Sequence, residues 1–228
     1  MLWHANTAGS ELWMRVSTSR FVVAMLSVLL LAAGPPAVGL AQQLDTTVSR
    51  ALSRIQDSST QSMGFVIIER VLRAQGSALE RANAEILADS MVAMVLDTVS
   101  HGLNWKTRSL IIFTLGYSAS ETARSPAFEA AKYRLARIAF EAQAARDRSS
   151  AVYQLTTIPD SQFALDILKR IALSDDDDTS YWAVVRLRDG MGDKGGIAVL
   201  KELWDSGGVK GPRARTRMSY MARRYGWK

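Results

Sequence analysis

One segment of this chain repeats itself at an interval of 32 residues. Apolar residues of similar size also match in this register, as in Ile167 with Val199 and Ile171 with Leu203. The copied apolar positions fall on two helical stripes joined by a turn, and one such pair of helices cannot bury both stripes alone. The repeat therefore predicts an array of antiparallel helix pairs, each packed against the next. The identical pairs are Ala151 and Ala183, Val152 and Val184, Leu155 and Leu187, Leu168 and Leu200, Lys169 and Lys201, and Ser174 and Ser206.

The repeat continues weakly in both directions. Upstream, residues 135–140 match residues 168–173 at an interval of 33, which predicts the second helix of an earlier pair. Downstream, Arg217-Met218 matches Arg186-Leu187 at an interval of 31. The helix that contains this match has no second helix to complete a pair, and we expect it to cap the array.

These residues resemble the short bacterial variety of HEAT-like repeats. The first helix of each pair has an alanine four positions before a core leucine, and the second helices share the pattern of residues 167–171 and 199–203. The resemblance covers about residues 124–225, although the chain lacks the Asp-x-x-x-Arg usual at the start of the first helix. It implies an all-α solenoid of antiparallel helix pairs over residues 121–228, ending in a cap helix.

Helical periodicity also runs through residues 42–120, but without a readable repeat. An irregular helical bundle is therefore an alternative for this part. The run Leu110 to Phe113 would suit a strand by composition, yet Trp105, Phe113 and Tyr117 lie at helical spacing, which favours a helix. We expect short polar breaks between helices. They are residues 57–60, 76–77, 100–104, 118–125, 147–149, 159–160, 175–179, 189–196 and 207–212.

Residues 1–41 have the pattern of a secretory signal peptide. Two arginines precede an uncharged run over residues 21–34, and small residues occupy the −3 and −1 positions of a cleavage site after Ala41. Because the stretch before Met14 is unusual for a signal, Met14 is an alternative start. An N-terminal membrane anchor is the rival interpretation, but the strongly apolar run is shorter than the roughly 20 residues of a spanning helix. We expect export to the periplasm or cell envelope, with no transmembrane segment after cleavage.

The residue inventory is poor in catalytic and metal-binding groups. The chain has no cysteine and two histidines, of which only His101 lies outside the predicted signal peptide. We therefore expect no enzyme activity, metal site or cofactor. The remaining enzymatic alternative is a serine hydrolase that uses Ser118 with His101. The sequence around Ser118 approaches a nucleophile elbow but lacks its second glycine.

Two further motifs have a functional and a structural interpretation. Residues 190–195 fit the G-x-G-x-x-G pattern of dinucleotide-binding turns, but a helix is expected before them instead of a strand, which favours an inter-helix loop with a glycine C-cap. The four aspartates of residues 175–178 could bind calcium, but they lack the spacing of a dedicated loop. We expect Asp178 or Thr179 to cap the next helix instead.

Residues 210–228 contain several arginines and lysines, no acidic residue and three aromatic residues. The functional interpretation of this stretch is an anion-binding surface formed by arginines between aromatic rings. The structural interpretation is a cap helix whose arginines extend over the last apolar layer. Adjacent aromatic residues at a helix start, Tyr181 and Trp182, are further candidates for a binding groove, although core packing is the rival interpretation. The predicted partner-binding residues are Arg213, Arg217, Tyr220, Arg223, Arg224, Tyr181 and Trp182.

Together these patterns predict an exported, non-catalytic scaffold that binds a protein or peptide partner in the periplasm or cell envelope. The alternative is a module that adheres to anionic lipid or polysaccharide through its basic C-terminal stretch, since the net charge of the chain is +6. Nucleic acid is not expected as a partner of an exported protein.

Overall fold

A computed structural model of the protein describes residues 49–57, 59–73, 78–97, 102–121 and 126–228. All regular elements in these ranges are helices and no strand occurs among them, which confirms the all-α prediction. None of these helices combines the length and apolar character needed to cross a membrane. The predicted signal peptide, the alternative start at Met14 and the alternative anchor all lie outside the described ranges.

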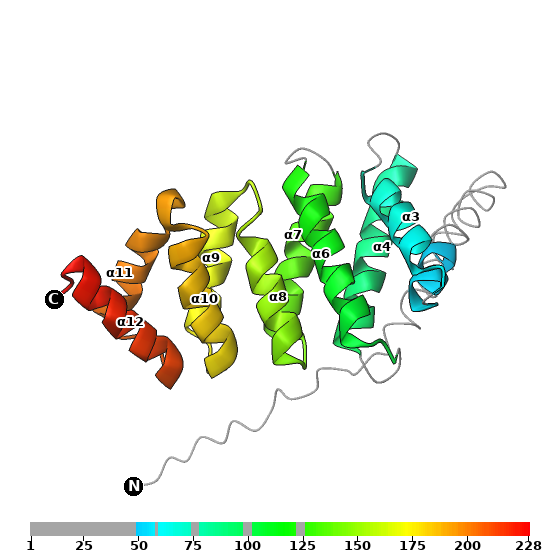
Figure 1. Cartoon of the computed structure of the whole chain (residues 1–228). Coiled ribbons are helices and arrows are strands. Elements are labelled where there is room, and N and C mark those ends of the chain that lie inside the picture. The colour runs from blue at the N-terminus through cyan, green and yellow to red at the C-terminus, as the bar shows by residue number, and fades with distance from the viewer. Residues whose placement is uncertain (1–48, 58, 74–77, 98–101, 122–125) are drawn as a thin grey trace, which may run out of the picture. The chain divides into compact units, whose positions relative to one another are not determined.

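Residues 46–228 form one compact unit, within which a first helix covers residues 49–56. The later elements are labelled in Figure 1. They are α3 (Gln61–Arg73), α4 (Ala78–Leu96), α6 (Trp105–Glu121), α7 (Pro126–Glu141), α8 (Ala145–Leu155), α9 (Ser161–Ala172), α10 (Asp177–Asp189), the 3-10 turn η1 (Gly192–Lys194), α11 (Gly196–Ser206) and α12 (Pro212–Tyr225).

The helices pack in two interleaved rows. Each helix from α6 to α12 packs against the next one in the chain, and α6, α8, α10 and α12 also pack against one another in that order. The second row runs from α4 through α7 and α9 to α11. Side chains of α6, α8 and α10 therefore share one face although they are far apart in sequence.

The apolar residues that are identical in the two copies of the repeat are buried by this packing. Ala151 and Leu155 of α8 and their counterparts Ala183 and Leu187 of α10 all have 0% exposure. Leu168 and Leu200 of the second row are likewise fully buried. Burying a leucine side chain contributes about 1.5 to 3 kcal/mol, so the repeated positions account for much of the packing between successive helices.

Two predicted breaks lie inside helices. Helix α8 begins at Ala145, so residues 147–149 belong to its first turns and the break lies at residues 142–144. The Ser149 hydroxyl donates to the carbonyl oxygen of Ala145 at 2.9 Å, which satisfies this polar side chain within the helix. Helix α6 likewise continues through Ser118 to Glu121.

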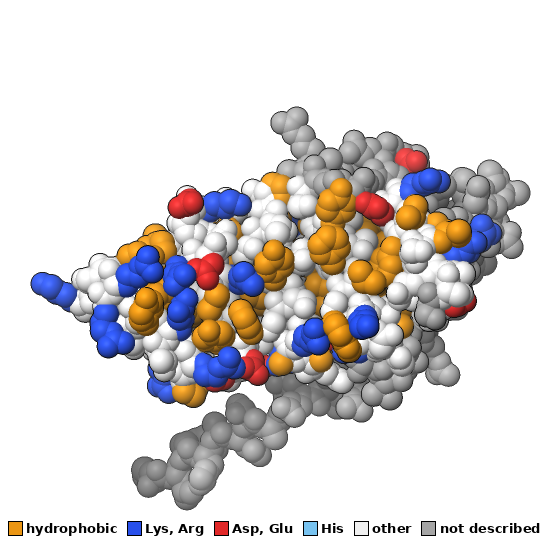
Figure 2. All heavy atoms as spheres, viewed as in Figure 1, with side chains coloured by type: hydrophobic (Ala, Val, Ile, Leu, Met, Phe, Trp, Pro, Cys, Tyr) orange, Lys and Arg blue, Asp and Glu red, His pale blue; other side chains and the backbone are white. Residues whose placement is uncertain are grey.

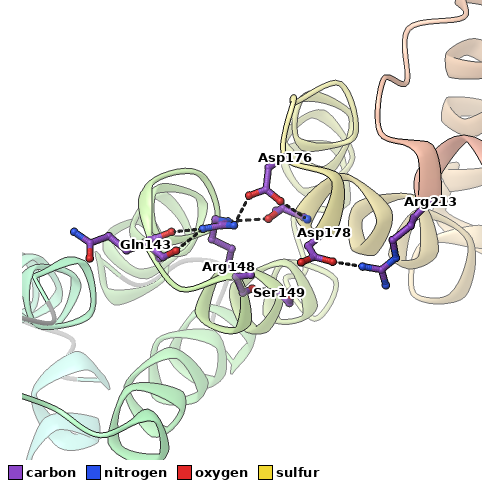
Figure 3. A network of polar contacts seen from close by, with 9 residues as sticks. Gln143, Arg148, Ser149, Asp176, Asp178 and Arg213 are labelled. Atoms are coloured by element: carbon purple, nitrogen blue, oxygen red, sulfur yellow. Dashed lines mark hydrogen bonds and ion pairs between the residues drawn. The ribbon is translucent and has the colours of Figure 1, made fainter.

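The cap of α10 also differs from the prediction. Asp176, not Asp178 or Thr179, is the N-cap residue, because its Oδ1 accepts a hydrogen bond from the Thr179 amide at 2.9 Å. Its other carboxylate oxygen pairs with Arg148 of α8. Figure 3 shows the Arg148 side chain reaching from α8 to this cap. The helix start is therefore fixed by a contact from the preceding helix of the same row as well as by its own sequence.

Candidate functional site

A cavity of about 900 Å³ opens on the face shared by α6, α8 and α10. This volume is in the range of sites that hold small ligands or short peptide segments. We call its principal side chains the arginine–aromatic face. They are Trp105, Lys106, Phe113, Arg146, Tyr153, Trp182 and Arg186.

Helical spacing places these side chains together. On α6, Trp105 and Phe113 are eight residues apart, and on α10, Trp182 and Arg186 are four apart, so each pair lies on one side of its helix. On α8, Arg146 and Tyr153 are seven apart and also lie on one side. The row packing of the three helices then joins these stripes into one surface.

Three of the four aromatic rings of this face are exposed to solvent, and the fourth, Trp182, is partly buried against the core. Exposure is 43% for Trp105, 56% for Phe113 and 46% for Tyr153. Figure 2 shows hydrophobic side chains interspersed with lysine and arginine on the viewed face of the molecule. A cluster of exposed aromatic side chains around a cavity is a frequent mark of a binding surface.

Two arginines of the face lie over aromatic rings of a neighbouring helix. The Arg146 guanidinium carbon is 3.6 Å from the centroid of the Trp105 ring. The Arg186 guanidinium carbon is 4.5 Å from the Tyr153 ring and 5.8 Å from the Trp182 ring. Such stacking restricts the planar guanidinium while leaving its N–H edges available for an anion.

The charge of the cavity is mainly positive. Its lining contains Lys106, Arg146 and Arg186 but a single carboxylate, Asp178, which pairs with Arg213 of α12. Figure 3 shows the Asp178 side chain of α10 and the Arg213 side chain of α12 facing each other. Within the part of the chain that the structure describes, no carboxylate lies within ion-pair distance of the three cations.

The structure brings some of the predicted binding residues to this cavity. Trp182 lines it, and Tyr181 packs edge-on against Trp182 with the ring centroids 5.4 Å apart. The Arg213 guanidinium carbon lies 4.6 Å from the Tyr181 ring, so Arg213 adjoins the cavity through both Tyr181 and Asp178.

The other predicted residues lie on α12, away from the cavity lining. The Arg217 guanidinium carbon is 5.6 Å from the Tyr220 ring, and the Arg217 Nε is buried without a hydrogen-bond partner among the described atoms. Arg223 and Arg224 are exposed in the last turn of the helix. These residues form a separate basic surface.

Sequence reasoning missed Lys106, Phe113, Arg146 and Arg186. The available signal was a second stripe on each helix, beside the core stripe, in which aromatic and basic residues recur at intervals of four, seven or eight. The contact of Arg146 with Trp105 could not be read from this signal, because the two residues are 41 positions apart and belong to different helices.

The remaining candidate sites are occupied by structural contacts. The Asp175 carboxylate pairs with Lys210 at 2.8 Å, and Asp177 accepts from the Arg213 amide at 3.1 Å, so all four aspartates of residues 175–178 have protein donors. Gly190 is the C-cap of α10 and follows a helix, as the loop interpretation predicted.

Ser118 is 2% exposed on α6, and its hydroxyl has no hydrogen-bond partner among the described atoms. His101, its proposed base, lies outside the described ranges. The described ranges hold no group of three or more histidine, aspartate or glutamate side chains placed to bind a metal ion. The chain matches no protein-family profile, no curated protein and no solved structure.

Proposed function

We propose that this protein is an exported, non-catalytic helical-repeat scaffold that binds another protein through the arginine–aromatic face. The observation that carries the proposal is the cavity of about 900 Å³, with its exposed aromatic rings and stacked arginines. Interfaces are enriched in tryptophan, tyrosine and arginine, and the two aromatic side chains bury a large area while losing little conformational freedom.

Three observations support a repeat array. Every second helix from α6 to α12 packs against the next of its row. The residues repeated at 32 positions are buried at equivalent places on α8 and α10. Polar contacts between successive helices of the first row recur as well, since Arg108 of α6 reaches Asp147 of α8 and Arg148 of α8 reaches Thr179 of α10. Such an array presents one side of each first helix on a continuous surface.

Export and the absence of catalysis are proposed on the sequence. The pattern of residues 1–41 and the lack of cysteine fit an exported chain that is held together by burial alone. The cavity lining contains neither histidine nor cysteine, and its one carboxylate is paired. These side chains suit recognition of a partner better than acid-base or nucleophilic chemistry.

The test is a phage-display selection on the purified protein, with a face variant for counter-selection. Phe113→Ala together with Tyr153→Ala removes two exposed rings and leaves the core intact. We expect peptides that bind the natural protein and lose about tenfold or more in affinity for the double variant. The matched control is Phe140→Ala, which removes a ring of 39% exposure on α7 that does not line the cavity. Peptides that bind all three proteins equally would refute the proposed site.

A second candidate function rests on α12. Arg215, Arg223 and Arg224 are exposed near Tyr220 and Tyr225, whose exposures are 46% and 40%, and none of these arginines has an ion pair with a described carboxylate. Arginine beside exposed tyrosine fits adhesion to an anionic lipid or polysaccharide surface. Binding to vesicles rich in anionic lipid, lost between about 50 and 200 mM salt and abolished by Arg223→Gln with Arg224→Gln, would support this function.

A further inference from the structure

We propose that the arginine–aromatic face recognises an extended acidic segment of its partner. The segment carries two carboxylates four residues apart, with an apolar side chain midway between them. This inference rests on the proposed protein-binding function and specifies the chemistry of the ligand.

The first argument is the charge of the cavity. Its three cations, Lys106, Arg146 and Arg186, face only Asp178, which Arg213 already engages. Three arginines elsewhere in the unit serve a structural purpose instead, since Arg108, Arg134 and Arg148 each pair with a carboxylate of another segment. The cavity cations are thus left for an external anion, and an acidic partner complements them.

The second argument is the geometry of the two stacked arginines. Arg146 is in the first turn of α8 and lies over Trp105, whereas Arg186 lies over Tyr153 near the last turn of α8. The seven residues between Arg146 and Tyr153 span about 10 Å along the helix axis. An extended chain advances about 3.3 Å per residue and every second side chain lies on the same face, so carboxylates four residues apart can reach both guanidinium groups.

The third argument is the apolar lining of the cavity. Phe113 of α6, Tyr153 of α8 and Trp182 of α10 line the same cavity as the two arginines, and their rings give it an apolar surface. An apolar side chain placed between the two carboxylates would cover these rings and exclude water from the flanking ion pairs. Each stacked guanidinium can then meet a carboxylate with two parallel N–H donors.

The cations also line an open cavity that has room for a single peptide chain. A flat bilayer would instead meet exposed positions such as Arg223 and Arg224 of α12. The arginine–aromatic face therefore fits a peptide better than a lipid surface.

The test measures fluorescence anisotropy of labelled nine-residue peptides with the purified protein. The first peptide has two aspartates separated by Ser-Leu-Phe, and in the second both aspartates are replaced by asparagine. We expect the first to bind at least about tenfold more tightly than the second, since ion pairs to arginine are strong hydrogen bonds. Peptides with adjacent aspartates, or with eight residues from one to the other, should bind more weakly than the first.

Protein variants identify the site. Arg146→Gln and Arg186→Gln should each weaken the first peptide by about tenfold and leave the asparagine peptide unchanged. The matched control is Arg137→Gln, which removes an exposed arginine of α7 that pairs with Glu141 outside the cavity. Circular dichroism and the urea midpoint should match between all three variants and the natural protein.

Three other results would overturn acid recognition, the protein-binding function or the choice of a peptide as the ligand. If the asparagine peptide binds as well as the aspartate peptide, and both are lost in the Phe113→Ala and Tyr153→Ala variant, acid recognition is wrong while the protein-binding function stands. If neither peptide binds and display selection also yields no face-dependent peptide, both proposals fail. If anionic vesicles compete for the face through Arg146 and Arg186, the ligand is a lipid surface and the peptide proposal is overturned.

Discussion

Arg108 Nε of α6 donates to Asp147 Oδ2 of α8 across 2.6 Å, so a carboxylate with no solvent exposure is paired from the neighbouring helix of its row. The next helix pair contains a related contact, in which Arg148 Nε donates to the Thr179 hydroxyl at 2.8 Å. Thr179 follows Asp147 by the repeat interval of 32 residues. The same position of successive helices is thus held by an arginine of the preceding helix.

Removing Arg108 should destabilise the protein strongly. Arg108→Ala leaves Asp147 buried and uncompensated, and breaking a buried ion pair in this way costs about 3 to 5 kcal/mol in the free energy of unfolding. The measurement is the urea midpoint. Adding Asp147→Asn to this variant should recover part of the loss, because the buried charge is gone. Arg137→Ala, which breaks an exposed pair, should lose less than about 1 kcal/mol. Equal losses of unfolding free energy in Arg108→Ala and Arg137→Ala would show that the buried ion pair contributes no more to stability than the exposed one.

Gly196→Ala should weaken the contact between α10 and α11. A Cβ at this position would lie 1.9 Å from the Leu187 carbonyl oxygen and 2.7 Å from that of Met191, and backbone atoms cannot rotate away. Overpacking of this kind costs about 1 to 3 kcal/mol. The control is Gly192→Ala, since the nearest atoms to a Cβ there belong to Ile197 at 4.0 Å. Urea unfolding that is unchanged in Gly196→Ala would mean that α10 and α11 are less tightly packed than the structure shows.

The Asp160 carboxylate should contribute stability that is lost in acid. The hydrogen bond from the Phe163 amide, together with the bond from Lys132, holds the pKa of Asp160 below its ordinary value of 3.8. A depressed pKa in the folded state favours folding above the unfolded value, and this contribution disappears as the pH falls through the folded pKa.

Asp160→Asn removes the negative charge and keeps the cap, because asparagine can also cap α9. The free energies of unfolding of the natural protein and the variant should differ by a constant amount above about pH 5 and converge as the pH is lowered through 3.8 and below. Urea titrations at a series of pH values measure the difference. Asp193→Asn, at an exposed carboxylate of the η1 turn, is the control and should show no such convergence. A difference that stays constant down to pH 3 would contradict the assignment.

The sequence predicted the helical class and the buried positions because both follow from local periodicity. Leu155 and Leu187, or Leu168 and Leu200, could be named as core from spacing alone, and all four have 0% exposure. The start of α8 could not be predicted in this way. Asp147 is polar and favours a break by composition, yet its charge is satisfied by Arg108, 39 residues earlier.

The candidate site was harder to predict for a related physical reason. Charge density along the sequence points to residues 210–228, whereas the cavity collects residues from three helices between Trp105 and Arg186. Trp182 was identified because adjacent aromatic residues are unusual at a helix start. Arg146 was not, since its significance depends on the ring of Trp105 on a neighbouring helix.

Replacing Arg186 by lysine tests whether the peptide carboxylate is bound by the planar guanidinium group or by positive charge alone. Arg186→Lys keeps the positive charge, but lysine cannot stack a planar group between the Tyr153 and Trp182 rings or present two parallel donors to a carboxylate. We expect the affinity for the two-aspartate peptide to fall by about three- to tenfold, while the free energy of unfolding changes by less than about 0.5 kcal/mol. Anisotropy titrations and urea unfolding measure the two quantities. Arg224→Lys, at an exposed position that does not line this cavity, should leave both unchanged. Full peptide affinity in Arg186→Lys would show that the face attracts anions by charge alone, and the spacing rule for the two carboxylates would then have no structural basis.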